Sequence, residues 1–171
     1  MAMKYEDFLV QTLGKCNVIS PLRQNRKPGS PVYKFVSDDE RVLYDVSLES
    51  FNKYSQNGQA PISFEKAGPK EMIFFEPAKT KVGIVTCGGL CPGLNNVIRS
   101  LFNQLWYRYG VSRIVGIRYG YEGLICDYNH PVIELTPQMV NYIHLTGGTI
   151  LGSSRGHQDV SKMVDTIEIM N

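Results

Sequence analysis

The sequence predicts an α/β fold with a Rossmann-like parallel sheet, incomplete at 171 residues, and an irregular N-terminal extension before it. Residues 82–86 form a continuous apolar run, which is typical of a strand buried on both faces. Apolar residues then recur at helical spacing from Leu94 to Tyr109, and a second apolar run follows at Arg113–Ile117. This order of strand, helix and strand predicts a βαβ unit.

Residues 1–80 are interpreted as an N-terminal extension, and residues 81–171 as the first part of the α/β domain. Proline- and glycine-rich breaks interrupt the extension, and its apolar residues show no strong helical period after the first fifteen residues. Two short runs of β-branched and aromatic residues, 32–36 and 41–46, flank the polar stretch 37–40. This pattern is typical of a β-hairpin.

The alternation of helices and strands continues after residue 117. A capping hydroxyl at Thr136 followed by Pro137 predicts the start of a helix that runs to about Leu145. Residues 149–151 predict a short third strand that leads into a glycine turn. Three strands make a thin sheet for this class, so the domain is expected to be unfinished at the end of the chain.

A last helix is predicted close to the end of the sequence. Asp159 or Ser161 is placed to cap its N-terminus, because short polar side chains accept hydrogen bonds from the first free N–H groups of a helix. One face of this helix is predicted to carry Val160, Met163, Val164 and Ile167.

Composition excludes several classes of function. The formal net charge is +2, with 43% hydrophobic and 20% charged residues, so bulk electrostatics does not favour nucleic acid or an anionic membrane as a partner. No apolar stretch is long enough to span a membrane, and the N-terminus does not resemble a secretory signal. A cytoplasmic location is expected. A glycosome- or peroxisome-type organelle is the alternative, because the sorting signal for such an organelle lies at the C-terminus of a protein, which this sequence is not expected to include.

The cysteine pattern indicates reduced thiols. A zinc site would need a second Cys/His pair at matched spacing, and a redox motif would be Cys-x-x-Cys, one residue shorter than the gap between Cys87 and Cys91. Disulfides are rare in the cytosol. We therefore expect free thiols at Cys16, Cys87, Cys91 and Cys126.

The first candidate site is a glycine loop between the first strand and its helix, which contains Gly88, Gly89 and Gly93. Glycines allow a tight turn that brings backbone N–H groups near an anion, and the following helix offers a positive dipole end. The loop is therefore interpreted as a phosphate site, and the alternative is a structural turn that binds nothing. Its glycine spacing does not fit the dinucleotide fingerprint. Gly88 and Gly93 have the separation of a P-loop, but Leu94 and Asn95 replace the Lys-Ser/Thr that a P-loop requires.

The second candidate site is the glycine loop 147–156, in which Arg155 is the only charged residue and Gly156 follows it. A guanidinium fork suits phosphate oxygens, whereas the alternative is a surface arginine in an ion pair. Both loops and the segment 118–124 leave from the carboxyl ends of predicted strands, where open parallel sheets bind ligands. We expect these three segments to converge on one edge of the sheet.

Other polar residues are interpreted as structural. His144 and His157 are placed late in a helix and in a loop, and Asp159 is more consistent with a cap than with catalysis. Glu122 could act as an acid or base, but no partner for it is evident in the sequence.

The motifs resemble those of 6-phosphofructokinases. Residues 85–99, Val-Thr-Cys-Gly-Gly-Leu-Cys-Pro-Gly-Leu-Asn-Asn-Val-Ile-Arg, are similar to the first phosphate loop of that family. Residues 120–124 and 147–156 are similar to its next two motifs, in the same order. Residues 37–44 and 64–70 resemble the extension of the long, ATP-using branch found in plants, kinetoplastids and some bacteria.

The resemblance implies transfer of a phosphoryl group from ATP to the 1-hydroxyl of fructose 6-phosphate, a step of glycolysis. It implies that Gly88 and Gly89 hold the donor phosphates and that Tyr121 lies near the nucleotide. Arg155 would bridge the donor and the transferring phosphoryl group, as the transition-state stabiliser. Gly93 and Gly156 are assigned to the same phosphate-binding loops.

The resemblance implies Mg²⁺ as a cofactor of the complete protein and ATP as its co-substrate. The family motifs for Mg²⁺ and for the general base are expected downstream and are absent from this sequence, so no metal ligand is assigned in it. The sequence is accordingly interpreted as the N-terminal portion of an ATP-dependent 6-phosphofructokinase that is inactive alone. The alternatives are a pyrophosphate-dependent enzyme and a phosphate- or nucleotide-binding module without catalysis. The resemblance also implies a homo-oligomer, either a tetramer or a dimer, of the complete protein.

Overall fold

The computed structural model of the chain describes residues 5–24, 34–89 and 91–170. Contacts between Cα atoms divide the chain into two compact units, Met1–Phe74 and Phe75–Asn171. Each unit is described by itself below.

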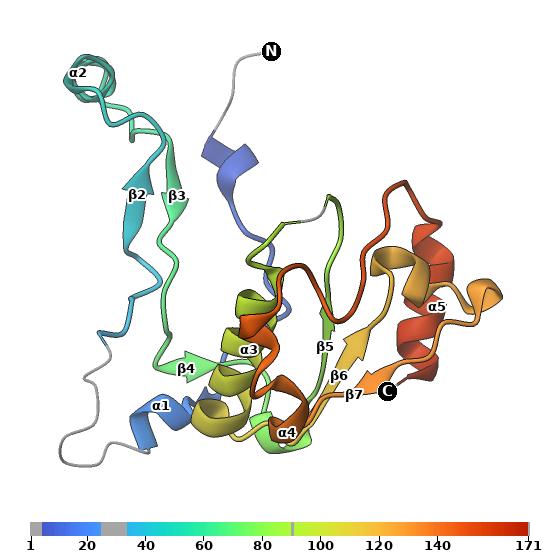
Figure 1. Cartoon of the computed structure of the whole chain (residues 1–171). Helices are drawn as coiled ribbons and strands as arrows, with labels where there is room; N and C mark the ends of the chain where they lie inside the picture. Colours follow the sequence, from blue (N-terminus) through green and yellow to red (C-terminus); the bar gives the residue numbers. More distant parts are fainter. Residues whose placement is uncertain (1–4, 25–33, 90, 171) are drawn as a thin grey trace. The chain divides into compact units, whose positions relative to one another are not determined.

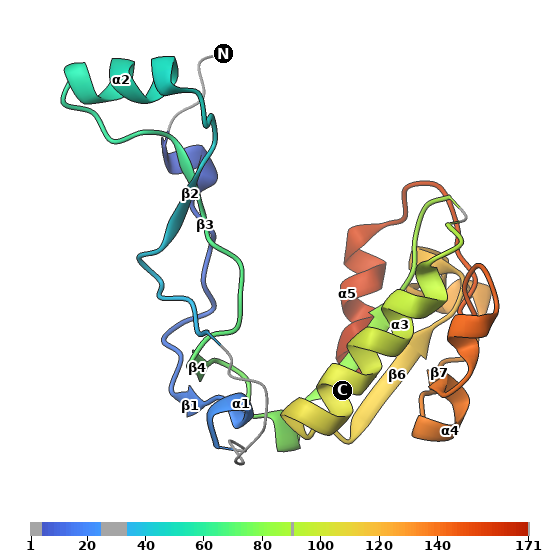
Figure 2. The ribbon, with the colours of Figure 1, turned by 60° about the vertical axis from the view of Figure 1, so that its left-hand side comes forward.

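The N-terminal unit is built from short elements around two small antiparallel pairs of strands (Figure 2). One pair joins β1 to β4, with Val18 opposite Ile73, and the other joins β2 to β3, with Val42 opposite Phe64. The elements are η1 (Tyr5–Phe8), β1 (Val18–Ile19), α1 (Pro21–Gln24), β2 (Arg41–Leu43), α2 (Leu48–Gln56), β3 (Ser63–Glu65) and β4 (Met72–Ile73).

The predicted hairpin between 32–36 and 41–46 is wrong for the residues that the structure describes, and residues 32–33 lie outside them. Strand β2 pairs with β3, more than twenty residues further along the chain, and the described part of 32–36 forms no strand. The backbone N–H of Val36 instead donates to the carbonyl of Pro69 at 2.9 Å. The guanidinium of Arg41 bonds the hydroxyl of Ser63 at 2.8 Å, which adds a side-chain contact to the long-range pairing. Tertiary partners therefore outweighed the local turn signal.

Helix α2 was not predicted, although Leu48, Phe51 and Tyr54 recur at three-residue spacing, and none of its residues is buried. Its beginning is set by Ser47, whose hydroxyl accepts a hydrogen bond from the N–H of Ser50 at 3.3 Å. An N-cap of this kind satisfies one of the free amides of the first turn.

The C-terminal unit contains the predicted βαβ unit. Strands β5 and β6 are parallel, with Val82 opposite Ile114, and α3 connects them. The elements are η2 (Pro77–Lys79), β5 (Lys81–Val85), α3 (Leu94–Asn103), η3 (Gln104–Tyr109), β6 (Arg113–Ile117), η4 (Gly120–Leu124), η5 (Cys126–Tyr128), β7 (Ile133–Glu134), α4 (Pro137–Val140), η6 (Ile143–Leu145) and α5 (Val160–Ile169). The α/β class is confirmed.

The third strand differs from the prediction in place and direction. The sheet order is β5-β6-β7, and β7 runs antiparallel to β6, so the described sheet is only partly parallel. Residues 149–151 form a turn instead of a strand. Leu151 is fully buried there and packs against Gly116 of β6, so this segment contacts the face of the sheet rather than its edge. The short apolar run signalled burial and not strand pairing.

The helices also deviate in detail. The helix predicted from Thr136 to Leu145 divides into α4 and the 3₁₀ turn η6, although the predicted cap is present: the hydroxyl of Thr136 accepts from the N–H of Met139 at 3.3 Å. The helix that begins at Leu94 changes to a π-helical turn, η3, and ends at Gly110 with a φ of +74°.

Helices α3 and α5 lie on opposite sides of the sheet (Figures 1 and 2). The main core lies on the α3 side and contains Ile84, Ile98, Phe102, Val111, Ile114, Leu135, Val140, Ile143 and Leu151. On the α5 side, a cavity of about 270 Å³ separates sheet residues such as Gly83 and Val115 from Ile167 and Met170. The main core of this unit therefore lies on one face of the sheet, and packing on the other face leaves a cavity.

The predicted apolar faces were too broad. On α3, Val97 and Leu101 are 53% and 47% exposed, whereas the polar Asn95 is buried. On α5, Val160, Val164 and Ile167 are each more than half exposed. The periodic pattern located the helices, but it did not show which apolar residues have a neighbour to pack against.

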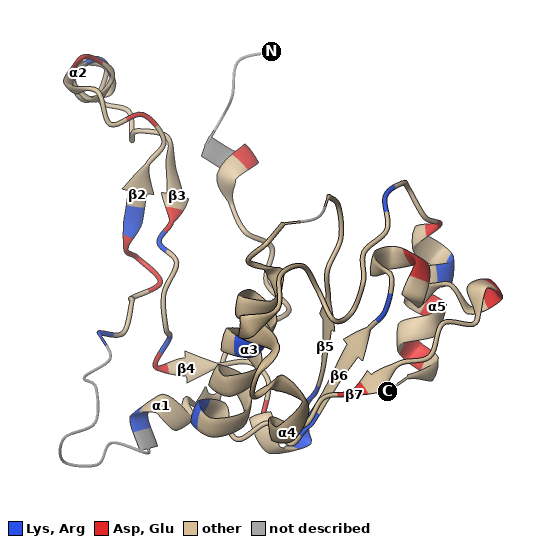
Figure 3. Cartoon of the chain, in the orientation of Figure 1, with Lys and Arg blue, Asp and Glu red and all other residues tan. Residues whose placement is uncertain are grey.

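Acidic and basic residues occur on both units, without a continuous stretch of one sign (Figure 3). No helix in the described parts of the chain is both long and apolar enough to cross a membrane.

Candidate phosphate-binding site

Three segments meet beyond the carboxyl ends of β5 and β6. The first glycine loop (residues 86–93) follows β5, the segment 118–124 follows β6, and the second glycine loop (residues 147–156) leads toward α5. The N–H of Gly88 donates to the carbonyl of Ser154 at 3.1 Å, and the N–H of Tyr119 donates to the carbonyl of Leu151 at 2.8 Å. The predicted convergence of these segments is confirmed by these hydrogen bonds.

The guanidinium of Arg155 lies directly against Gly89. A Cβ atom at position 89 would be 3.0 Å from Nη2 of Arg155, so the absence of a side chain makes room for the cation. Arg155 is exposed and forms no salt bridge with any residue that the structure describes. The alternative of a surface ion pair is therefore not supported, and the positive charge is free to meet an anion.

Gly88 and Gly89 serve this loop for different physical reasons. Gly88 has a φ of +92°, which side-chain-bearing residues rarely adopt, and its N–H is already bonded to Ser154. Gly89 has no such backbone requirement, but it is needed for the close approach of Arg155. Their predicted contact with donor phosphates stays a prediction.

Gly93 and Gly156 lie at the far ends of their loops. Gly93 is the N-cap residue of α3, with φ −89° and ψ 1°, and it provides no side-chain cap. Gly156 follows Arg155 with a φ of +113°, a conformation that favours glycine. Both allow the chain to turn beside the site, and no contact shows that either binds phosphate.

Tyr121 lies on η4, next to the junction of the loops. Its neighbour Gly120 has a φ of +62°, and a Cβ atom there would be 2.8 Å from Oγ of Ser154 and 3.1 Å from Sγ of Cys87. Gly120 is therefore packed between the two glycine loops, whereas Tyr121 is 45% exposed. Its role beside a nucleotide stays a prediction.

The sequence analysis did not identify two buried polar residues at this site, Thr86 and Asn95. Asn95 is 1% exposed and lies three and seven residues before the buried Ile98 and Phe102. A polar residue in register with the buried stripe of a helix was the signal that could have found it. Thr86 is 8% exposed and follows directly after β5.

Tyr119 is a further residue that the sequence did not reveal. It adopts a left-handed conformation with a φ of +57°, which is uncommon for a residue other than glycine. A Cβ atom at Gly152 would be 2.9 Å from its ring, so the ring lies against the second glycine loop. Arg118 donates to its hydroxyl at 2.9 Å, and the ring of His130 is 4.6 Å away between centroids.

The residues interpreted as structural have local roles or are exposed. His144 and His157 are exposed, and the carboxylate of Asp159 accepts hydrogen bonds from the amides of Ser161 and Lys162 as the cap of α5. The carboxylate of Glu122 lies 3.9 Å from Nε2 of His130, and the two form an ion pair when the imidazole is protonated. The four cysteines are free and exposed.

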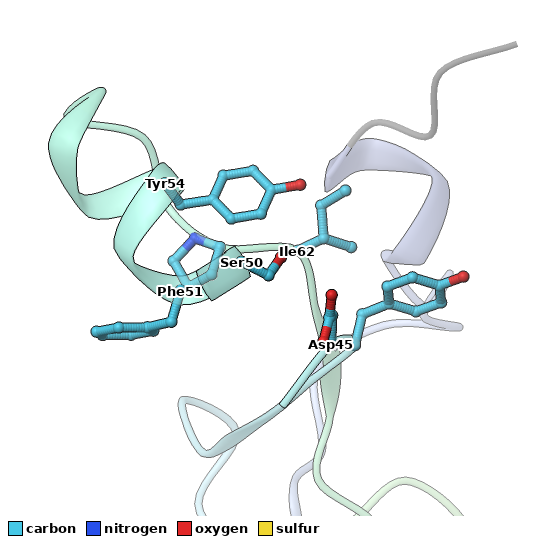
Figure 4. A pocket seen from close by; sticks show the side chains of 7 residues that line it. Asp45, Ser50, Phe51, Tyr54 and Ile62 are labelled. Atoms are coloured by element: carbon cyan, nitrogen blue, oxygen red, sulfur yellow. The ribbon is translucent and has the colours of Figure 1, made fainter. Parts of the chain in front are cut away.

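A separate cavity of about 290 Å³ lies in the N-terminal unit, between α2 and the ends of β2 and β3 (Figure 4). Its only charged side chain is Asp45, and the N–H of Ser47 donates to that carboxylate at 2.8 Å, which lowers the pKa of Asp45. The residues that line the cavity include no cation for a phosphate, so it is not the candidate site. It is lined by Tyr44, Asp45, Ser50, Phe51, Tyr54, Pro61 and Ile62.

Comparison with known proteins gives the family. The sequence model described as phosphofructokinase matches residues 81–171. An ATP-dependent 6-phosphofructokinase of Amycolatopsis methanolica is 47% identical over 172 residues, which cover 99% of this chain and 37% of that protein. One of Trypanosoma cruzi is 54% identical over 165 residues, covering 95% and 33%. ATP-dependent 6-phosphofructokinase 7 of Arabidopsis thaliana is 43% identical over 151 residues, covering 87% and 29%.

The chain spans about a third of the length of these relatives. It covers 37%, 33% and 29% of their sequences. A crystal structure of Pichia pastoris phosphofructokinase aligns with 61% of this chain and 10% of its own, with 27% identity and a TM-score of 0.44. The family assignment does not depend on this alignment. With the family model matching the whole of residues 81–171, which contain both glycine loops, the chain belongs to the phosphofructokinase family.

Proposed function

We propose that the protein, at its natural length, is an ATP-dependent 6-phosphofructokinase. The 1-hydroxyl oxygen of fructose 6-phosphate attacks the terminal phosphorus of ATP, the bond from that phosphorus to ADP breaks, and the hydroxyl proton passes to a base. The products are fructose 1,6-bisphosphate and ADP. The names of the relatives support both the reaction and the donor.

The observation that carries this proposal is the placement of Arg155 over Gly89. Phosphoryl transfer builds charge on oxygens of the transferring group, and a cation fixed beside them stabilises the transition state. Arg155 supplies such a cation from one loop, and the neighbouring loop has no side chain at Gly89 to block an anion's approach. Because no described carboxylate neutralises Arg155, the full charge is available to the phosphoryl group.

The residues described here do not by themselves supply a complete metal site. No group of three or more His, Cys, Asp or Glu side chains in these parts of the chain is placed to hold a metal ion. The Mg²⁺ that the resemblance implies for the complete protein stays a prediction. The homo-oligomeric assembly implied by the resemblance stays a prediction.

The test is a coupled assay of fructose 1,6-bisphosphate formation by the protein at its natural length, with either ATP or pyrophosphate as the donor. We expect turnover with ATP and little with pyrophosphate. For Arg155→Ala we expect kcat to fall roughly 10³-fold, as for loss of a transition-state cation, with a smaller change in KM for ATP. For Arg155→Lys we expect partial recovery, because an ammonium group lacks the guanidinium fork.

The matched control is Arg108→Ala, which removes one exposed positive charge from η3, away from both glycine loops. It should leave kcat within about twofold of the parent, as expected for a surface substitution. Unchanged turnover in Arg155→Ala would refute the role of Arg155. Turnover with pyrophosphate alone would transfer the protein to the pyrophosphate-dependent enzymes, and nucleotide binding without any turnover would favour a binding module.

A further inference from the structure

Buried polar side chains tie both ends of the first glycine loop to the second. At the start of the first loop, the hydroxyl of Thr86 donates to the carbonyl of Gly152 at 2.8 Å. Just after its end, the side-chain amide of Asn95 donates to the carbonyl of Thr146 at 2.8 Å, and its oxygen accepts from the N–H of Ile150 at 2.8 Å. The first loop is thus held to the second at two separated points.

The hydroxyl of Thr86 takes part in a directed chain of hydrogen bonds. Because its proton goes to the carbonyl of Gly152, it accepts from the hydroxyl of Thr149, 3.0 Å away. The hydroxyl of Thr149 in turn accepts from the N–H of Leu151 at 3.1 Å. Removal of the hydroxyl of Thr86 therefore leaves both the carbonyl of Gly152 and the hydroxyl of Thr149 without this partner.

The second glycine loop depends on these bonds for its position. Residues 146–159 form no helix or strand, so no regular ladder of backbone hydrogen bonds fixes them, and three single bonds reach their carbonyls from the N–H groups of Gly88, Asn95 and Tyr119. In addition, the side chains of Thr86 and Asn95 satisfy polar backbone groups of the loop, those of Thr146, Ile150 and Gly152. Buried polar groups are costly when unpaired, so each of these contacts specifies one placement of the loop.

Arg155 comes three residues after Gly152, and the loops are joined again between the two, where the N–H of Gly88 bonds the carbonyl of Ser154. A shift of the loop at Gly152 would therefore move the guanidinium away from Gly89. Displacements of about 1 Å at a reacting centre can lower turnover by as much as roughly 100-fold.

We propose that Thr86 and Asn95 are positioning residues for phosphoryl transfer: they fix the second glycine loop against the first, so that Arg155 lies over Gly89. This inference rests on the proposed function of Arg155. Neither side chain needs to touch the substrate, because both act through the backbone of the loop that carries the cation.

The test is Thr86→Val, which keeps the shape of the side chain and removes the hydroxyl. In the protein at its natural length we expect kcat to fall roughly 10- to 100-fold, while KM for fructose 6-phosphate changes by less than about threefold. Thr86→Ser restores the hydroxyl and should bring kcat back to within about threefold of the parent. Should Thr86→Val fail to fold, Thr149→Val removes the other hydroxyl of the chain, and kcat should again fall several-fold.

The control is Thr80→Val, because the hydroxyl of Thr80 also bonds a backbone carbonyl, that of Glu76 at 2.7 Å, but outside both loops. It should leave kcat unchanged. A combined variant separates positioning from general destabilisation: in an Arg155→Ala background, Thr86→Val should lower kcat no further, since there is no guanidinium left to position.

The two proposals fail in different ways. If Arg155→Ala keeps full turnover, the proposed role of Arg155 is wrong, and the positioning role falls with it. If Arg155→Ala loses turnover but folded Thr86→Val, or Thr149→Val in its place, keeps the parent kcat, the positioning proposal alone is overturned. An equal loss of kcat from Thr86→Val with and without Arg155 would likewise overturn it.

Discussion

Gly116 of β6 lets the second glycine loop press directly onto the sheet, and we predict that an alanine there destabilises the C-terminal unit. A Cβ atom at position 116 would be 2.4 Å from Cδ2 of Leu151 and 3.4 Å from Cδ2 of Leu135. The shorter contact is about 1 Å below an ordinary carbon–carbon separation. Leu151 is 0% exposed and Leu135 is 1% exposed, so both side chains are enclosed by other residues.

Overpacking of this kind costs roughly 1–3 kcal/mol. We therefore expect Gly116→Ala to lower the free energy of unfolding of the 171-residue chain by that amount. Urea denaturation followed by tryptophan fluorescence measures it. The single tryptophan, Trp106, stacks on the buried Phe102 with 5.5 Å between ring centroids, so its emission reports on this core.

The matched control is Gly83→Ala on the neighbouring strand β5. A Cβ atom at position 83 would be 3.7 Å from Cγ1 of Ile117, an ordinary contact. The free energy of unfolding should then stay within about 1 kcal/mol of the parent value. Leu151→Val removes the δ-methyl groups of the clash, so the penalty of Gly116→Ala should shrink by about 1 kcal/mol in that background. The reasoning is refuted if the penalty is the same in both backgrounds, or if the two glycine variants unfold alike.

Two further predictions concern the site and the N-terminal unit. Gly89→Ala places a methyl group 3.0 Å from Nη2 of Arg155. Because the guanidinium can swing away, the free energy of unfolding should hardly change, but kcat should fall roughly tenfold. A parent-like kcat in the coupled assay would contradict this. Lys66, whose Nζ is 2.6 Å from the carboxylate of Glu40, and the N–H of Ser37 hold the pKa of Glu40 below its ordinary 4.5. A pKa lowered by folding stabilises the folded unit above the ordinary pKa, and this contribution is lost as the pH falls through the lowered value. Hydrogen exchange of the β2 and β3 amides should therefore accelerate in that acidic range, and Glu40→Gln should flatten the dependence; an unchanged pH profile in the variant would argue against it.

The βαβ unit and the helix signals could be predicted because they depend on local physics. A continuous apolar run, the helical spacing from Leu94 to Tyr109 and the caps at Thr136 and Asp159 need no distant partner, and the structure contains each of them. The hairpin could not be predicted correctly, because β2 and β3 pair across a loop that includes an exposed helix.

The candidate site likewise contains residues that local sequence signals reveal and residues that they do not. Gly88, Gly89 and Arg155 stand out in the sequence, because glycine-rich turns and an isolated cation are local signals for an anion. Thr86 and Asn95 do not, because their importance lies in partners that are 50 or more residues away in the sequence: 66 for the bond from Thr86 to Gly152, and 51 for that from Asn95 to Thr146.

The sequence by itself determined the α/β class, the two glycine loops and the candidate cation, since backbone freedom, hydrophobic period and charge are properties of the residues themselves. Only the tertiary structure decided that Arg155 lies over Gly89, that β7 runs antiparallel and that residues 149–151 turn away from the sheet edge. These outcomes depend on which buried polar groups find partners and on how Leu151 packs against Gly116. The hydrogen-bond partners and the packing of Leu151 both involve segments that are far apart along the chain, so local sequence patterns do not reveal them.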